Sequence, residues 1–141
     1  KAVYNAVLRV KKEATKMLTP GTLIKQYHAE VGKIMTSELL GLGLIDKADV
    51  QNENPDWPAY KKYFMHGTSH HMGLDTHDYG ILTEPMQANM VFTVEPGIYI
   101  PAEGFGIRLE DNVVVQETGE PFNLMRNIPI EVEEIESLMN P

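Results

Sequence analysis

The sequence changes character at one histidine-rich segment, and this change limits the possible folds. The segment runs from His66 to His77 and contains four of the five histidines, with glycines at positions 67 and 73. Apolar residues recur at helical spacing before it, whereas short β-branched and aromatic runs follow it. A chain of 141 residues suits a single domain. We therefore expect an α+β fold in which helices pack on one side of an antiparallel sheet.

Two amphipathic helices are predicted in the first part of the chain. In residues 1 to about 18, apolar residues follow at steps of four, three, four and three, namely Val3, Val7, Val10, Ala14 and Met17. Pro20-Gly21 ends this helix, and residues 23–39 form a second one that closes near Gly41. Both are interpreted as core-packing helices. Residues 46–62 are predicted to be a loop with a short helical turn, and Trp57 is interpreted as a packing residue.

Three runs rich in β-branched and aromatic residues are predicted to be strands. They cover residues 90–95, 97–100 and 109–116. Residues 101–106 separate the last two runs, which fits a hairpin or a connection between neighbouring strands. A short acidic helix is predicted at residues 131–139, where apolar residues return to helical spacing.

Composition excludes several classes of function. The absence of cysteine excludes disulfides, thiolate metal sites and cysteine nucleophiles. A formal charge of −8 argues against nucleic acid or an anionic membrane as the partner. No apolar run approaches the roughly 20 residues of a membrane span, and we expect a cytoplasmic location. The first residue, Lys1, already belongs to a helical pattern, so the natural N-terminus is expected upstream.

Two glutamates stand at positions that suggest a site. Glu95 ends an apolar run and precedes Pro96-Gly97, and a carboxylate buried there would need a cation or hydrogen bonds. Arg108 and Glu110 would share one face of a strand, where the arginine can orient the carboxylate. An exposed salt bridge is the competing interpretation of that pair. Two carboxylates and an imidazole from separate segments outline a divalent metal site.

The histidines leave alternatives open when taken singly. His66 and His70 are four apart, which on a helix would make a zinc pair, but the neighbouring glycines argue against a helix. In an extended chain only one of His70 and His71 can face the site. His77 has aspartates nearby in the sequence, at positions 75 and 78, which suits either proton transfer or a solvated turn.

Taken together, three motifs resemble the pita-bread metallopeptidases, with aminopeptidase P (Xaa-Pro aminopeptidase) nearest and prolidase (Xaa-Pro dipeptidase) next. The motifs are His66-Gly67-x-Ser69-His70 with Gly73-Leu74-Asp75-x-His77-Asp78, Val94-Glu95-Pro96-Gly97-Ile98-Tyr99, and Gly106-Ile107-Arg108-Leu109-Glu110-Asp111. The resemblance implies the C-terminal portion of a pita-bread fold. It also implies an exopeptidase that hydrolyses the Xaa-Pro bond at the N-terminus of peptides through a hydroxide that bridges two metal ions.

The resemblance assigns a role to each matching residue. His70, Glu95 and Glu110 match metal ligands, with Glu110 bridging the two ions and Glu95 also assisting the attacking water as a general base. His66 and His77 match the histidines that contact substrate and stabilise or shuttle protons around the tetrahedral intermediate, and Arg108 matches the arginine that supports the ligand carboxylates. Manganese is the expected metal, with cobalt or zinc also possible. The expected partner is a peptide with proline at its second position.

The family's metal centre takes five protein ligands, and the other two are aspartates from a hairpin upstream of the motifs found here. Residues 1–141 are therefore expected to form the C-terminal half of a catalytic domain. Such a chain is expected to bind metal weakly and at a single site, and to be nearly inactive alone. A face that normally packs on the missing half would be exposed, so a homo-oligomer is expected.

Other functions within the same fold remain as alternatives. One is prolidase, which shares these motifs. Another is a non-catalytic pita-bread module that binds proteins, although such a module has no need of the ligand set. Methionine aminopeptidase and the metal-free creatinase fit the residues around His70 less well.

Overall fold

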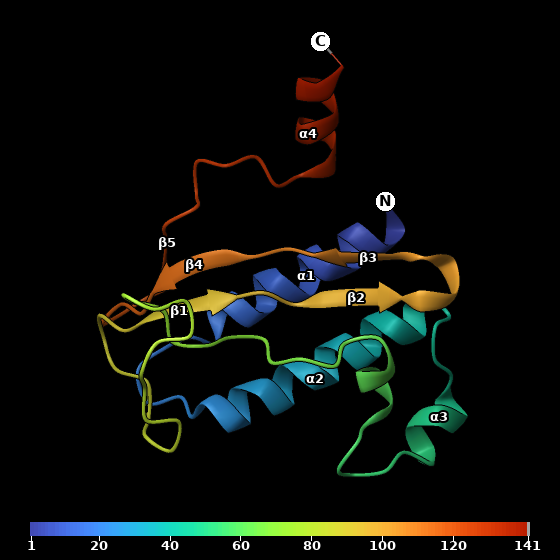
Figure 1. Ribbon diagram of the computed structural model, residues 1–141, viewed down its shortest axis with the longest axis horizontal. Coiled ribbons are helices and arrows are strands. Elements are labelled where there is room, and N and C mark those ends of the chain that lie inside the picture. Colours follow the sequence, from blue (N-terminus) through green and yellow to red (C-terminus); the bar gives the residue numbers. More distant parts are fainter. Residues whose placement is uncertain (141) are drawn as a thin grey trace.

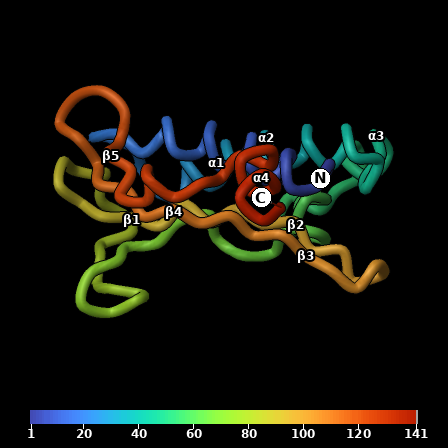
Figure 2. The backbone as a smooth tube through the Cα atoms, turned by 90° about the horizontal axis from the view of Figure 1, so that it is seen from above, coloured from blue at the N-terminus to red at the C-terminus, as the bar shows by residue number. Residues whose placement is uncertain are grey.

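The computed structural model describes residues 1–140, so Pro141, the last residue of the expected domain, lies outside the described residues. The elements in chain order are α1 (Ala2–Lys16), α2 (Ile24–Gly41), α3 (Lys47–Gln51), η1 (Ala59–Lys62), β1 (Val91–Val94), β2 (Gly97–Ile100), η2 (Pro101–Glu103), β3 (Phe105–Arg108), β4 (Asp111–Val114), β5 (Phe122–Asn123) and α4 (Val132–Met139). Helices α1 and α2 lie on the same side of the strands (Figures 1 and 2). This arrangement confirms the predicted α+β fold. Within residues 1–140, no helix is both long and apolar enough to cross a membrane.

The apolar stripe of α1 supplies one wall of the core, as predicted. Val7, Val10 and Ala14 are completely buried against the strands, together with Phe92 of β1 and Val113 of β4. Helix α2 adds the second wall through Tyr27, Val31, Met35 and Leu39. The interpretation of Trp57 as a packing residue is wrong: its side chain is 56% exposed, and the ammonium group of Lys61 lies 4.9 Å from its ring centre.

Strands β1 to β4 form one long antiparallel hairpin with an interruption in its middle. Val94 of β1 pairs with Asp111 of β4, whereas Gly97 of β2 pairs with Arg108 of β3. The predicted strand within residues 109–116 is confirmed, although β4 covers only Asp111–Val114. The assignment of the whole of 101–106 to a connection is wrong, because β3 begins at Phe105. Pro96 explains the break, because it has no N–H to donate to the opposite strand. Glu95 and Glu110 both lie in this interruption.

The histidine segment extends the sheet along the other edge of β1. The amide of Glu95 donates to the carbonyl oxygen of Thr68 (2.8 Å), and the amide of Thr93 donates to that of His70 (3.1 Å). His71 forms an antiparallel bridge with Phe92. The expectation that His66 and His70 do not share a helix is thereby confirmed. This pairing places the histidines beside the end of β1 that carries Glu95.

A buried ion pair joins α1 to the start of β4. Lys11 of α1 contacts Asp111, and the two side chains are only 5% and 10% exposed. Asn123 of β5 donates a further hydrogen bond to the same carboxylate at 2.7 Å. Burial lowers the pKa of Lys11, and the contact with Asp111 partly opposes this shift. Since Asp111 directly follows Glu110, the ion pair anchors the chain next to the hairpin interruption.

Replacing Lys11 with methionine is expected to destabilise the fold by roughly 3–5 kcal/mol, because Asp111 would remain buried without its cation. The free energy of unfolding from urea denaturation checks this. The matched control is Lys16→Met, which removes an exposed pair with Glu13 and is expected to cost less than about 1 kcal/mol. Equal losses in the two variants would contradict a stabilising role for the buried pair.

Candidate active site

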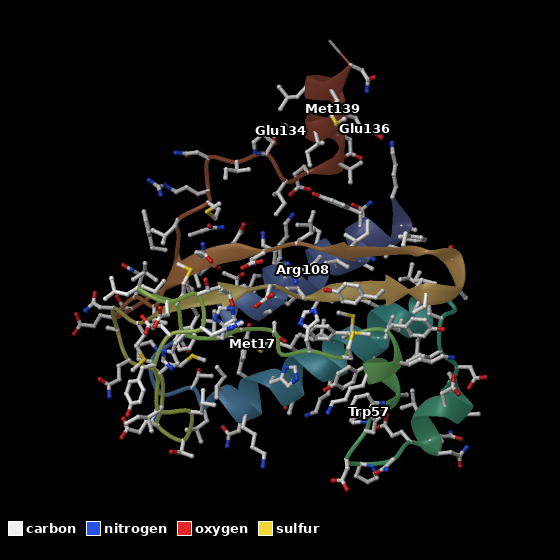
Figure 3. All side chains as sticks on the ribbon, in the orientation of Figure 1. Met17, Trp57, Arg108, Glu134, Glu136 and Met139 are labelled. Carbon is white, nitrogen blue, oxygen red and sulfur yellow. The ribbon has the colours of Figure 1, made fainter. Side chains whose placement is uncertain are left out.

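Five of the six residues singled out by the sequence line one open pocket of about 400 Å³. The lining consists of His66, Gly67, Ser69, His70, His77, Glu95 and Arg108. Glu110 is the exception: it lines a neighbouring pocket, and Arg108 takes part in both. Arg108 is labelled in Figure 3, where it lies on the hairpin strand β3. Three separate segments of the chain therefore meet at this pocket.

The imidazole of His70 faces the carboxylate of Glu95. His70 Nε2 lies 3.1 Å from Glu95 Oε1, while Nδ1 lies 2.9 Å from the carbonyl oxygen of His71. A carbonyl oxygen only accepts hydrogen bonds, so Nδ1 carries the hydrogen and donates it. The lone pair of Nε2 and the carboxylate would repel each other unless a proton or a metal cation lies between them. This pair of donors therefore fits a divalent cation.

Thr93 of β1 completes the surroundings of this pair. Its hydroxyl donates to Glu95 Oε1 at 3.3 Å and accepts from the amide of His70 at 3.2 Å. Thr93 is almost fully buried, so its orientation is fixed by the core. Thr93 was not predicted from the sequence as a site residue. Its place two residues before Glu95, on the same face of β1, is the signal that could have identified it.

Arg108 stands between the two glutamates. Its Nη1 lies 3.9 Å from Glu95 Oε2, and its Nε lies 3.9 Å from Glu110 Oε2. These separations give electrostatic attraction without short hydrogen bonds. Within residues 1–140, no group of three or more histidines and carboxylates is close enough to hold a metal ion. The structure thus brings His70 and Glu95 together but leaves Glu110 apart, beside Arg108.

His66 is held by a tyrosine that sequence reasoning did not assign to the site. His66 Nδ1 donates to the carbonyl oxygen of Gly67 (2.8 Å), so Nε2 accepts from the hydroxyl of Tyr99, also at 2.8 Å. The ring of Tyr99 lies against Gly97 and Gly106, where a Cβ atom would come within 2.8 Å and 2.6 Å of it. Glycine is therefore required at both positions for this close approach.

The other two histidines of the segment, His77 and His71, point in different directions. The ring of His77 lies edge-on to that of His70, with centres 4.4 Å apart, and lines the pocket. The ring of His71 instead packs on Phe92 at 4.4 Å, and burial lowers the pKa of His71. The expectation that only one of the two adjacent histidines faces the site is confirmed.

Comparisons with known proteins identify similar sequences and similar solved structures. The sequence pattern of metallopeptidase family M24 matches residues 1–117. The chain is 40% identical to the Xaa-Pro aminopeptidase of Haemophilus influenzae, over 98% of this chain and 34% of that protein. Two solved structures of Escherichia coli aminopeptidase P are also similar. One carries the inhibitor Pro-Leu (TM-score 0.83, 38% identity), and its alignment with this protein covers 98% of this chain and 34% of the enzyme's chain.

The second solved structure is the zinc-substituted Escherichia coli enzyme with product (TM-score 0.83, 36% identity). Its alignment covers 98% of this chain and 33% of the enzyme's chain. This chain spans about a third of the length of the curated relatives it matches. The similarity to aminopeptidase P confirms the resemblance and the fold expected from the three motifs. The match over residues 1–117 covers most of the chain. The chain therefore belongs to metallopeptidase family M24.

Proposed function

We propose that this chain provides the C-terminal half of the catalytic domain of an Xaa-Pro aminopeptidase, a hydrolase that removes the residue before proline from the N-terminus of a peptide. The observation that supports the proposal most directly is the 3.1 Å approach of His70 Nε2 to Glu95 Oε1 in a pocket shared with His66 and His77. Membership of family M24 and 40% identity to an Xaa-Pro aminopeptidase support the same reaction class.

The proposed metal ligands are His70 and Glu95, which lie 3.1 Å apart, together with Glu110, whose side chain would have to move towards them. A divalent metal ion bound there would supply an acidic water for attack on the peptide carbonyl. Manganese is the proposed ion because one imidazole with several carboxylates suits it. Cobalt and zinc remain alternatives, and the Escherichia coli enzyme has been prepared in a zinc-substituted form.

The protein groups around the pocket have separable proposed roles. Glu95 accepts a proton from the attacking water, and the Thr93 hydroxyl holds its Oε1 in place. Arg108 attracts Glu95 and Glu110 from between them and so keeps both carboxylates at the hairpin interruption. His66, oriented by Tyr99, and His77 contact the substrate near the carbonyl that becomes tetrahedral.

A non-catalytic module that binds proteins is the alternative from a different functional class. The joint presence of His66, His70, His77 and Glu95 in one pocket favours the enzyme, since a binding surface does not require them. Prolidase remains the alternative within the same chemistry. The expected cytoplasmic location stays a prediction.

Replacing His66 with alanine in the full-length protein is expected to lower kcat for an Xaa-Pro peptide by about 10²–10³-fold, because a group that moves or stabilises charge is removed. His71→Leu is the matched control. It replaces a histidine that packs on Phe92 outside the pocket, and it is expected to keep kcat. Cleavage is measured by release of the N-terminal residue. Similar kcat values for His66→Ala and wild type would contradict the proposed role.

The chain is also expected to associate with itself. Four apolar side chains at the end of the histidine segment and in the loop after it are well exposed: Leu74, Tyr79, Ile81 and Leu82. The weight-average mass from sedimentation velocity is expected to rise with concentration, and Leu82→Lys is expected to shift the equilibrium towards monomer. A wild-type chain that stays monomeric over a wide concentration range would contradict this expectation.

A further inference from the structure

Helix α2 contacts the histidine segment through two successive residues. The hydroxyl of Tyr27 lies 2.8 Å from Ser69 Oγ, and Nδ1 of His28 lies 3.1 Å from Thr68 Oγ1. Tyr27 is 2% exposed and Thr68 is 1% exposed, whereas His28 and Ser69 are half-buried, so these contacts lie at the edge of the core. Thr68 and Ser69 are two of the three residues between His66 and His70. Neither Tyr27 nor His28 lines the candidate active-site pocket.

We propose that Tyr27 and His28 are positioning residues that fix the segment from His66 to His70 and thereby aim both histidines at the site. The inference rests on the proposed function, because it assigns these residues a part in that reaction. On one side the segment is held by backbone hydrogen bonds from Thr93 and Glu95 of the β1 edge. On the other side α2 holds it through the two side-chain contacts.

The two contacts are hydrogen bonds between neutral groups. Burial raises the pKa of Tyr27, so its hydroxyl keeps its proton. Burial lowers the pKa of His28, and the nearby charge of Lys61 acts in the same direction, so the imidazole is neutral at pH 7. A buried hydrogen bond that loses one partner leaves the other unsatisfied, and the segment would shift to satisfy it.

Phe64 provides a further connection between α2 and His66, because it lies between the rings of His28 and His66. Its ring is fully buried, and its centre lies 6.1 Å from that of His28 and 4.9 Å from that of His66. A movement of the His28 side chain is thus passed to His66 by direct packing. His66 also accepts a hydrogen bond from Tyr99. A shift of the segment would therefore displace the His66 imidazole relative to both Phe64 and Tyr99.

The test compares variants of the full-length protein with an Xaa-Pro peptide as substrate. Tyr27→Phe is expected to lower kcat by about tenfold and to change KM by less than about twofold, because displaced catalytic groups impair the chemical step. Tyr60→Phe is the matched control, since it removes a hydroxyl from another buried tyrosine, whose ring lies against Gly32 of α2. The control is expected to keep the wild-type kcat.

A double-mutant cycle distinguishes positioning from general loss of stability. Ser69→Ala removes the same hydrogen bond from the other side, so Tyr27→Phe combined with Ser69→Ala is expected to lose no more kcat than the worse single variant. His28→Asn keeps a hydrogen-bonding group near the position of Nδ1 and is expected to retain most of the kcat that His28→Leu loses. Multiplicative losses in the double variant would overturn the inference, as would a change in KM alone.

Amide hydrogen exchange over residues 67–70 separates this inference from the proposed function. Exchange is expected to be faster in Tyr27→Phe than in wild type or Tyr60→Phe. If the wild-type protein does not cleave Xaa-Pro peptides, the proposed function fails, and the exchange rates alone decide whether α2 fixes the segment. If the wild type is active while Tyr27→Phe matches Tyr60→Phe in both kcat and exchange, the positioning inference fails by itself.

Discussion

One missing hydrogen bond interrupts the hairpin at the place where the candidate site lies. Pro96 has no N–H to donate to the opposite strand, although its carbonyl oxygen still accepts from the amide of Leu109 at 3.3 Å. The register is the same on both sides of the interruption, because Val94 pairs with Asp111 and Gly97 pairs with Arg108. Glu95 and Glu110 therefore occupy opposite positions on the two strands, and both carboxylates come close to Arg108.

Those carboxylates have to be stabilised in a protein that is already negatively charged. Arg108 lies between them, and His70 faces Glu95 from the histidine segment. The contacts that hold these residues in place lie outside the pocket. Lys11 anchors the start of β4, and α2 holds the histidine segment from behind. The proposed metal site would therefore rely on helices that contribute no ligand.

The sequence predicted those parts of the fold that have a local cause. The stripe of Val7, Val10 and Ala14 specified α1, which ends at Lys16, shortly before the turn at Pro20-Gly21. The boundary between β3 and β4 was missed because its cause, Pro96, lies on the opposite strand. Tyr27 and Ser69 are 42 residues apart, and His66 and Tyr99 are 33 apart, so neither contact leaves a pattern in the sequence. The ligand set itself came from resemblance to a family rather than from spacing alone.

Calorimetric titration with Mn²⁺ is the sharpest test of the proposed half of a catalytic domain. It would be made on this chain and on a version that also carries the upstream aspartate hairpin of the family. We expect at most one weak site on this chain, and two tight sites with Xaa-Pro cleavage only in the longer version. Two tight sites or appreciable cleavage by this chain alone would contradict the proposed function. An absence of metal binding in both versions would contradict it as well, and would favour the protein-binding module.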